Sequence, residues 1–267
     1  MKYVIQQYKN DDNLNKRISI HDYSTSKEEW FEWMFNRLQL APNMKVLEIG
    51  CGNGAFWKSV AGRLPKGLEI HLTDYSDGML ESARKAAEEI QKAYPEKRLQ
   101  FVVDKRDATN FSYPVDDFDR IMANHMLYHL DKDSRRKLYP QIRELLAEQG
   151  RFSCSLIGRT HFRELHALLK EYYPEIEIPS ASFDIWLENA AEELGEYFKV
   201  ISEEEQDNDL LVPEEELVYA YVSSYSAKAG ESIGRNKEEF LDRVRSEMDE
   251  EGYFYIHKST GMIVCEP

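Results

Sequence analysis

The chain contains, at residues 46–54, the stretch Val46-Leu47-Glu48-Ile49-Gly50-Cys51-Gly52-Asn53-Gly54, in which an apolar run gives way to glycines at every second position. Val46, Leu47 and Ile49 are apolar and partly β-branched, which is typical of a central parallel strand. The glycines allow a sharp turn and a close approach of the backbone to a ligand. The stretch therefore predicts a buried strand, a glycine turn and the start of a helix, which many nucleotide-binding folds share.

The spacing of the glycines narrows the choice of ligand. Gly50, Gly52 and Gly54 form G-x-G-x-G, which is neither the G-x-x-x-x-G-K-S/T of triphosphate loops nor the G-x-G-x-x-G/A of nicotinamide enzymes. Glu48 lies inside the strand, two residues before the first glycine. A pyrophosphate gains nothing from a further negative charge there, whereas a ligand with an amino group and a sulfonium tolerates it well.

Asp74 is the second residue that points to a nucleoside. It ends the next predicted strand, about twenty residues past the turn, where an acid that binds ribose hydroxyls is expected. One carboxylate can accept hydrogen bonds from two hydroxyls, which an amide cannot do. A helix is expected to follow, with Ser76 or Asp77 as its N-cap.

Four motifs occur in a characteristic order: VLEIGCGNG at 46–54, LTDYSDGML at 72–80, RDATNF at 106–111 and FDRIMANHMLYHL at 118–130. With them the chain resembles the class I S-adenosylmethionine-dependent methyltransferases, most strongly the small-molecule branch that includes the ubiquinone/menaquinone C-methyltransferase type. The resemblance covers roughly residues 40–157. It implies S-adenosyl-L-methionine as cofactor and a seven-stranded sheet whose last strand runs antiparallel.

The expected cofactor site combines the turn with residues that follow the neighbouring strands. The resemblance sets Asp107 against the adenine amino group and Asn124 with its neighbours beside the methionine part. Met79 is expected to pack on the adenine or ribose, although a core methionine is an equally good interpretation. Cys51 is interpreted as a small residue where bulk is forbidden, not as a reactive thiol. The full set is Glu48, Gly50, Cys51, Gly52, Asn53, Gly54, Asp74, Tyr75, Met79, Asp107, Ala108, Asn124 and Met126.

Two histidines are the candidate catalytic residues. Methyl transfer is an in-line displacement, so the enzyme mainly positions donor and acceptor and excludes water, and it needs a base only if the acceptor carries a proton. His125 and His129 follow the fourth predicted strand, at the ligand crevice of a parallel sheet. His125 is the better candidate for a general base, and a structural role in the loop is the alternative. No third ligand has recognisable spacing, so no metal site is predicted.

Four residues are candidate contacts of the acceptor substrate. The resemblance folds the N-terminal segment over the site as a lid, which makes His21 and Tyr23 candidates, and the alternative is an ordinary loop. Tyr128 lies in the loop of the two histidines. Arg159 follows the fifth predicted strand and suits an anionic acceptor, although a solvated helix start explains it equally well.

Composition indicates the compartment and excludes some partners. The net charge of −15 weighs against a nucleic-acid substrate, and the acidic run at 203–216 is interpreted as solvated surface. Three distant cysteines without a CxxC motif indicate a reducing cytosol, without disulfides or structural zinc. No apolar run reaches membrane-spanning length, and residues 1–10 lack the apolar core of a signal peptide.

Alternating strand and helix patterns predict an α/β fold, a Rossmann-like doubly wound sheet with helices on both faces. The predicted strands are at 45–50, 68–73, 99–103, 117–122, 150–157 and 197–202, with a hairpin from 253–257 and 262–265. The predicted helices are at 27–40, 54–63, 78–93, 132–147, 161–172, 184–194, 213–226 and 236–249. The pattern does not decide which C-terminal segments supply strands six and seven.

The expected organisation is one compact domain in three parts. Residues 1–40 form the lid and an aromatic helix, 41–173 the cofactor-binding methyltransferase core, and 174–267 a helical cap or insertion with the last strands.

The predicted function is that of a cytoplasmic S-adenosylmethionine-dependent methyltransferase acting on oxygen, nitrogen or carbon of a small-molecule acceptor. No nucleic-acid or membrane partner is expected, and the oligomeric state stays open. A nicotinamide-dependent oxidoreductase is disfavoured by the glycine spacing and Glu48. A methyltransferase of protein or RNA is disfavoured by the acidic charge. A non-catalytic S-adenosylmethionine-binding regulator is the third alternative; it would bind the cofactor without turning over an acceptor.

Overall fold

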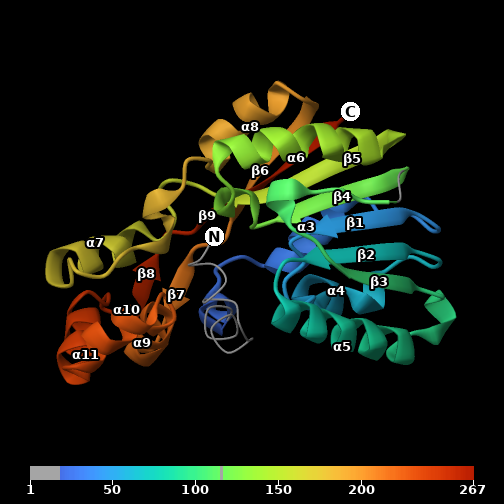
Figure 1. Cartoon of the computed structure of the whole chain (residues 1–267). Helices are drawn as coiled ribbons and strands as arrows, with labels where there is room; N and C mark the ends of the chain where they lie inside the picture. The colour runs from blue at the N-terminus through green and yellow to red at the C-terminus, as the bar shows by residue number, and fades with distance from the viewer. Residues whose placement is uncertain (1–18, 115–116) are drawn as a thin grey trace.

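A seven-stranded sheet forms the centre of the computed structural model, which describes residues 19–114 and 117–267 (Figure 1). Its order is β3-β2-β1-β4-β5-β9-β6. The first five strands are parallel, and β9 runs antiparallel to both of its neighbours, β5 and β6. This confirms the Rossmann-like sheet with one antiparallel strand. The strands are β1 (Lys45–Ile49), β2 (Glu69–Asp74), β3 (Gln100–Lys105), β4 (Phe118–Asn124), β5 (Leu146–Ile157), β6 (Lys199–Asp207) and β9 (Ser259–Glu266).

Helices cover both faces of the sheet because successive strand residues point to opposite sides. Val46 belongs to the apolar cluster of one face, together with α3, α4 and α5, and Leu47 belongs to the cluster of the other face, together with α6 and α8. Ser76 is the N-cap of α5 and accepts a hydrogen bond from the Met79 backbone, as predicted. The helices are α3 (Trp30–Leu38), α4 (Ala55–Ser59), α5 (Asp77–Ala93), α6 (Lys132–Leu145) and α8 (Leu187–Gly195).

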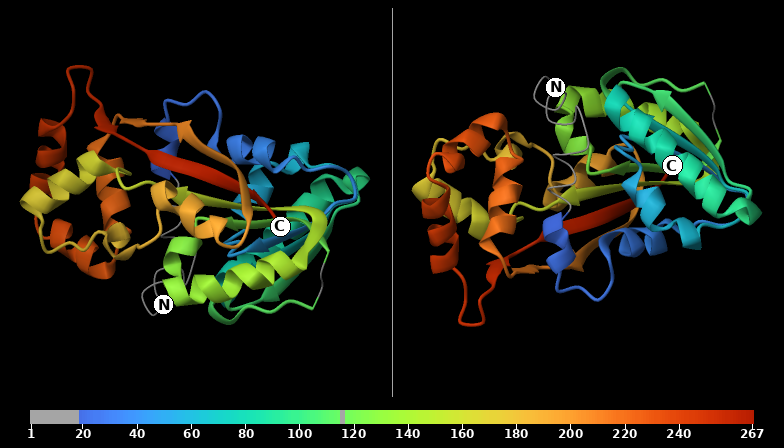
Figure 2. Two further views of the ribbon diagram at one scale, coloured as in Figure 1. Left: turned by 90° about the horizontal axis from the view of Figure 1, so that it is seen from above. Right: turned by 90° about the horizontal axis from the view of Figure 1, so that it is seen from below.

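A helical cap lies beside the sheet at the end where β5 and β6 finish (Figures 1 and 2). Its elements share a third apolar cluster, which includes Ile20 and Phe162 from segments outside the cap helices. Helix α7 belongs to this cluster although it precedes residue 174, and the division of the chain at residues 40 and 173 stays a prediction. The elements are α7 (Arg163–Tyr172), β7 (Leu210–Val212), α9 (Glu215–Ser223), α10 (Ala227–Gly234), α11 (Lys237–Ser246) and β8 (Phe254–Ile256).

The predicted C-terminal hairpin is wrong. β8 pairs with β7 in a separate two-stranded sheet, whereas β9 pairs with β5 and β6. Gly261, which falls between the two strands of that predicted hairpin, lies inside β9, where a Cβ atom would come within 2.5 Å of the Glu204 carbonyl and 2.6 Å of the Leu187 side chain. Glycine is therefore needed there for close packing of α8 and β6 against the strand.

Several other boundaries differ from the prediction. β6 was expected to end at residue 202 but continues to Asp207. It is an edge strand, so the acidic side chains at 203–205 and Asp207 can point to solvent while the backbone stays extended. The helix predicted over 213–226 is α9, and α10 begins separately behind an N-cap at Ser226. The helix predicted over 54–63 is α4 followed by the short 3-10 turn Ala61–Arg63.

Candidate active site

The glycine turn between β1 and α4 has the conformation that the sequence predicts. Gly50, Gly52 and Gly54 all have positive φ, at +78°, +56° and +78°. A Cβ atom on Gly50 would come within 3.0 Å of Met126, whereas one on Gly52 would meet nothing within 4 Å. Gly52 therefore borders open space in which a ligand can approach the backbone. The Asn53 side chain accepts a hydrogen bond from the Ala55 backbone and closes the turn from within.

Asp74 joins the end of β2 to this turn. One carboxylate oxygen accepts a 3.0 Å hydrogen bond from the Gly52 N–H, and the other accepts one of 2.8 Å from the Ser76 N–H. Burial raises the pKa of Asp74, and these backbone donors oppose the rise. Each oxygen has a second lone pair, so the group can accept two further hydrogen bonds of the kind that ribose hydroxyls donate. Tyr75 is the exposed neighbour on the outer side.

Glu48 and Asn124 form a buried polar pair at the centre of the site. Glu48 is 2% exposed and accepts hydrogen bonds from the Trp57 indole at 2.6 Å and from the Asn124 amide at 2.9 Å. Burial raises the pKa of Glu48 to about 7. Among the described residues, the buried Oδ1 of Asn124 has no hydrogen-bond partner. An unsatisfied acceptor beside a carboxylate suits an ammonium group, so these residues fit the amino-acid part of S-adenosylmethionine.

The remaining predicted cofactor residues lie near the ends of neighbouring strands. The Asp107 carboxylate caps the 3-10 turn Ala108–Asn110, where it accepts from the Thr109 N–H at 2.9 Å, and its contact with adenine stays a prediction. Met79 and Met126 are buried. Burial raises the pKa of the Cys51 thiol well above its ordinary value, which agrees with an unreactive cysteine.

His125 occupies a strained position at the end of β4. Its φ is +50°, and its N–H donates to both the carbonyl and the hydroxyl of Ser155 at 3.1 Å. Its ring centroid lies 5.4 Å from that of Trp30. Burial and then the charge of Lys258 lower the pKa of His125 to about 3. The imidazole is therefore uncharged at neutral pH, and its role as a general base stays a prediction.

The other two candidate residues of that loop, Tyr128 and His129, lie beside Phe183. His129 belongs to the 3-10 turn Leu127–His129, and Tyr128 stacks on Phe183 with ring centroids 4.4 Å apart. No group of three or more possible metal ligands occurs among residues 19–114 and 117–267.

The described part of the lid is attached to the cap. His21 and Tyr23 lie in the 3-10 turn Ile20–Tyr23, Ile20 is fully buried, and the Thr25 N–H donates to the Asp209 carbonyl at 2.7 Å. The imidazole Nδ1 of His21 is buried and has no hydrogen-bond partner within the described ranges. The rest of the predicted lid, residues 1–18, lies outside those ranges.

Arg159, predicted as a substrate contact, lies against α8. Its N–H donates to the Glu188 carboxylate at 2.8 Å, and its guanidinium carbon is 5.5 Å from the centroid of the Trp186 ring.

Two residues that the sequence interpretation missed, Trp57 and Lys258, belong to this region. Trp57 donates to Glu48 from α4, and the buried Lys258 places its ammonium 5.7 Å from the Trp30 ring centroid. The His161 Nδ1 lies 3.0 Å from the Ser259 carbonyl. No motif marks Trp57 or Lys258: Trp57 lies in α4, nine residues after Glu48, whereas Lys258 comes from a distant segment of the chain.

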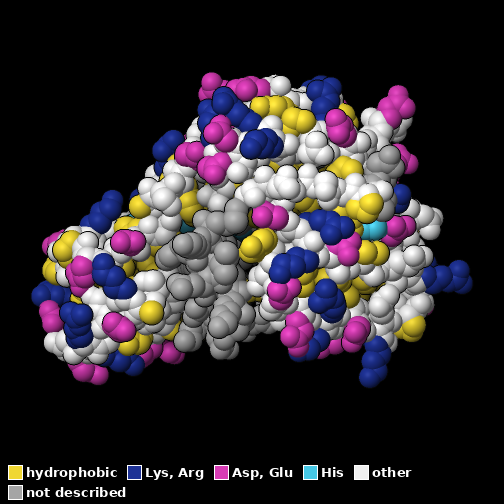
Figure 3. Space-filling model, viewed as in Figure 1, with side chains coloured by type: hydrophobic (Ala, Val, Ile, Leu, Met, Phe, Trp, Pro, Cys, Tyr) yellow, Lys and Arg dark blue, Asp and Glu magenta, His cyan; other side chains and the backbone are white. Residues whose placement is uncertain are grey.

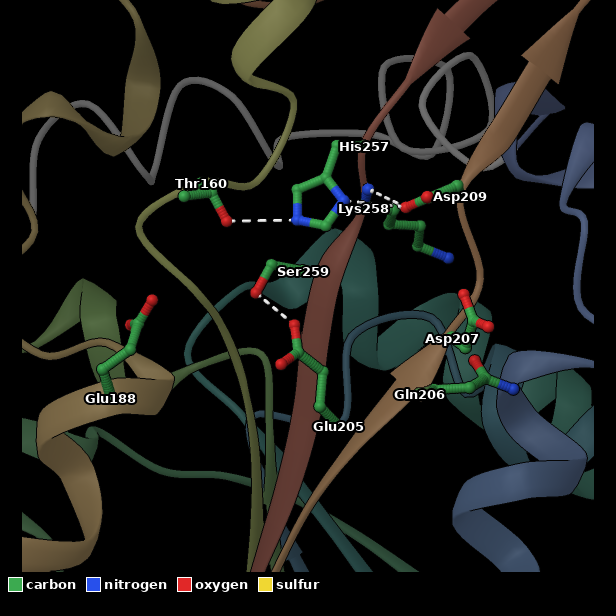
Figure 4. A pocket seen from close by; sticks show the side chains of 9 residues that line it. All are labelled: Thr160, Glu188, Glu205, Gln206, Asp207, Asp209, His257, Lys258 and Ser259. Atoms are coloured by element: carbon green, nitrogen blue, oxygen red, sulfur yellow. Dashed lines mark hydrogen bonds and ion pairs between the residues drawn. The ribbon is translucent and has the colours of Figure 1, made fainter.

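A second, acidic pocket of about 400 Å³ opens where β6 and β9 meet the cap (Figure 4). Asp209 accepts a 2.8 Å hydrogen bond from the Lys258 N–H and contacts the His257 Nδ1 at 3.0 Å. The other ring nitrogen of His257 lies 3.2 Å from the Thr160 hydroxyl. None of the glycine-turn residues lines it, whereas Lys258 does. Its lining is Thr160, Glu188, Glu205, Gln206, Asp207, Asp209, His257, Lys258 and Ser259.

The surface and the helices add two observations. Lysine and arginine side chains are interspersed with acids over the face in Figure 3, where the described atoms form no continuous basic patch. Within residues 19–114 and 117–267, no helix combines the length and apolarity needed to cross a bilayer.

Comparison with known proteins finds methyltransferases, both as a matching family and as relatives. Residues 46–150 match a family described as a methyltransferase domain. Malonyl-acyl-carrier-protein O-methyltransferase 1 of Ilyobacter polytropus is 27% identical over 195 residues, which cover 73% of this chain and 66% of that protein. A second such enzyme of the same organism is 26% identical over 60% of this chain and 57% of its own length. The match thus spans just under two thirds of the first relative and somewhat over half of the second.

Solved structures share the fold at low sequence identity. The 4+2 cyclase SpnF has a TM-score of 0.58 and 15% identity, covering 98% of this chain and 95% of its own. Mycolic acid cyclopropane synthase CmaA1, solved with S-adenosylhomocysteine (SAH), has a TM-score of 0.54 and 15% identity, covering 89% of this chain and 82% of its own. At such identities these likenesses establish the α/β fold.

Proposed function

The chain carries a class I S-adenosylmethionine-dependent methyltransferase domain, and from that premise we propose that it transfers the cofactor's methyl group to a small-molecule acceptor. The acceptor atom is oxygen, nitrogen or carbon. The observation that carries this proposal is the polar set of Glu48, Asp74 and Asn124 at the carboxyl ends of β1, β2 and β4. Asp74 accepts from the N–H of Gly52, whose own Cβ position is open, and Asn124 donates to Glu48.

Each of these residues has a proposed task in holding the cofactor. Asp74 accepts the two ribose hydroxyls, while its bonds to the Gly52 and Ser76 amides keep the carboxylate in place. Glu48 and the unsatisfied Oδ1 of Asn124 receive the ammonium group. When bound, the cofactor supplies an electrophilic methyl on sulfur. The residues of the chain therefore mainly orient the acceptor and exclude water.

The catalytic assignment of His125 and His129 remains a proposal. A pKa of about 3 makes His125 a poor general base but a permanently neutral hydrogen-bonding group at physiological pH. That character suits an acceptor that is already deprotonated or carries a free lone pair. His125 is therefore proposed to orient the acceptor.

The partners and the compartment are also proposals. The Ilyobacter relatives are named for an acceptor carried by a protein, so the small molecule is proposed to be free or carrier-bound. A nucleic-acid acceptor is not proposed, because the chain has a net charge of −15. Cytoplasmic location is proposed because all three cysteines are free and buried.

A two-step experiment tests the function. Isothermal titration should show saturable binding of S-adenosylmethionine and SAH and much weaker binding of NAD. Production of SAH is then measured with pooled acids, phenols, amines and thioesters. Tighter binding of NAD would overturn the proposal. Cofactor binding without turnover in any pool would favour the non-catalytic regulator.

A further inference from the structure

Three polar side chains on the wall of the acidic pocket form a row of hydrogen bonds (Figure 4). The Nδ1 of His257 lies 3.0 Å from the Asp209 carboxylate, and its Nε2 lies 3.2 Å from the Thr160 hydroxyl. Thr160 follows β5, Asp209 precedes β7 and His257 precedes β9, so the row joins three connections between the sheet and the cap. All three side chains line the same cavity of about 400 Å³.

The hydrogen-bond partners assign the proton of the neutral His257 imidazole to one nitrogen. An ionised carboxylate only accepts hydrogen bonds, so Nδ1 carries the proton and donates to Asp209. The Nε2 atom then has a lone pair and accepts a hydrogen bond from the Thr160 hydroxyl. A carboxylate that orients an imidazole, which in turn accepts from a hydroxyl, is the arrangement that activates a hydroxyl as a nucleophile.

Other residues hold the carboxylate and the imidazole in place. Asp209 accepts a 2.8 Å hydrogen bond from the Lys258 N–H on Oδ1 and one from the Tyr255 hydroxyl on Oδ2. Burial acts to raise the pKa of Asp209, but these bonds and the neighbouring His257 lower it below its ordinary value, so the group is ionised at neutral pH. The His257 N–H donates to the Glu164 carboxylate at 2.8 Å, which anchors the backbone of the imidazole.

Thr160 is accessible to a substrate, because the residue is exposed at the mouth of the pocket. Its own N–H has no hydrogen-bond acceptor within residues 19–114 and 117–267. When a hydroxyl attacks a carbonyl, the N–H of the same residue is a common donor to the oxyanion that forms. The pocket therefore contains a nucleophile, a base, an orienting carboxylate and a donor for the oxyanion.

The charges of the lining indicate which substrates the pocket favours. Carboxylates outnumber ammonium groups in it, with Glu188, Glu205, Asp207 and Asp209 against Lys258. A cleft lined mainly by negative charge concentrates cations and repels anions. The cavity, about 400 Å³, has the size of a small-molecule site. A small molecule with a positive charge therefore matches the pocket.

We propose that this pocket is a second active site, which hydrolyses small cationic carboxylic esters. Thr160 is the nucleophile, His257 the general base and Asp209 the residue that positions the imidazole. The Thr160 oxygen forms a bond to the ester carbonyl carbon while its proton passes to the Nε2 of His257. The bond to the alcohol oxygen then breaks, and His257 returns the proton to that oxygen. Water releases the acyl group from Thr160 by the same steps, which gives the carboxylic acid and restores the threonine. This activity is independent of methyl transfer.

Acid release from three esters by the full chain, followed by titration at constant pH, tests the activity. Acetylcholine should be hydrolysed at least tenfold faster in kcat/KM than its uncharged isostere 3,3-dimethylbutyl acetate, and the anionic monoethyl succinate should be slowest. Thr160→Val and His257→Gln should each lower kcat at least about 100-fold. Asp209→Asn should lower kcat while KM stays within twofold. Thr25→Val, at an exposed threonine outside the pocket lining, is the matched control.

A covalent probe gives a second measurement. Diisopropyl fluorophosphate should phosphorylate Thr160 in the wild-type chain, as located by mass spectrometry, and should leave His257→Gln unlabelled. Thermal unfolding of each variant checks its fold, and Thr160→Val changes only an exposed side chain. The absence of hydrolysis of all three esters by the wild-type chain would overturn the proposal. Undiminished hydrolysis by Thr160→Val, or a preference for the anionic ester, would overturn it as well.

Discussion

The side-chain amide of Asn124 donates a 2.9 Å hydrogen bond to the Glu48 carboxylate, which joins the carboxyl ends of β4 and β1 through two side chains. Burial raises the pKa of this carboxyl to about 7, although the bonds from Trp57 and Asn124 favour its ionised form. The protonation of Glu48 should therefore respond to whatever charge is placed beside it.

Cofactor binding is expected to release a proton from Glu48, because the ammonium and sulfonium of S-adenosylmethionine favour the carboxylate. The expected release approaches one proton near pH 6 and disappears by pH 9, where Glu48 is already ionised. Calorimetric titration in two buffers of different ionisation enthalpy measures it. Glu48→Gln should abolish the release, and equal release by that variant would assign the proton to another group.

The raised pKa of Glu48 also makes the stability of the ligand-free protein depend on pH. Because the pKa of Glu48 is higher in the folded chain than its ordinary 4.5, the folded state binds the proton more tightly. The resulting stabilisation is complete below pH 4.5 and is lost as the pH rises through about 7. The loss is about 3 kcal/mol by linkage. Urea titrations of Glu48→Gln should show a correspondingly flatter profile over this range.

Asp74→Ala is expected to lower SAH affinity at least about 100-fold, because two hydroxyl donors lose a charged acceptor at about 1.5–3 kcal/mol each. The variant also loses the bonds from the Gly52 and Ser76 amides, so thermal unfolding is measured in parallel. The SAH affinity of Asp74→Asn, which keeps one acceptor oxygen, should lie between that of the wild type and that of Asp74→Ala. Unchanged affinity in a folded Ala variant would remove Asp74 from the ribose.

Gly52→Val is expected to abolish cofactor binding while the chain stays folded. The matched control is Gly252→Val, since both glycines have positive φ, +56° and +84°, and both face open space. Each substitution should cost about 1–3 kcal/mol of strain. Only the first should affect SAH binding in a calorimetric titration. Equal effects on binding would show that the turn does not border the ligand.

The turnover rate at saturating cofactor should be flat between about pH 5 and pH 7, because the pKa of His125 is held near 3. His125→Ala should therefore lower kcat by less than the roughly 10²–10⁴-fold of a lost general base. A pH–rate profile of both proteins checks this. An acid limb near pH 6.5 that vanishes in the variant would restore His125 as the base.

Lys258→Met is expected to stabilise the ligand-free chain at neutral pH. Burial lowers the pKa of Lys258 from 10.5 to about 8, so the folded state holds the proton less tightly than the unfolded state. The cost, about 3 kcal/mol, is complete below pH 8 and is relieved as the pH rises to 10.5. Thermal unfolding should therefore show a gain at pH 7 that shrinks towards pH 10.5. A loss of stability at pH 7 would contradict it.

Local signals were sufficient for the first half of the fold. The apolar run before Gly50 and the N-cap at Ser76 each depend on a few adjacent residues, and the structure has the expected strand and helix. The pairing of β7 with β8 and of β9 with two strands was missed because apolar alternation does not identify the partner. Gly261 illustrates this, since close packing and a tight turn both call for glycine.

The candidate site was predictable only where a motif marks it. Glu48 and Asp74 stand out because of their distance from the glycines, and their roles toward the cofactor stay predictions. Lys258 carries no such mark, because it belongs to a segment far from His125 in the chain. The low pKa of His125 has the same origin, since it comes from burial and from the charge of a lysine more than a hundred residues away.

The position of β9 between β5 and β6 affects how the chain is made on the ribosome. β6 has no neighbour in the sheet until β9, about fifty residues later, has left the exit tunnel. At roughly 5–20 residues per second, this interval lasts several seconds. During this interval, the acids at 203–205 and Asp207 repel the same strand of another nascent chain. The acidic run therefore opposes pairing between unpaired β6 strands while the protein is being made.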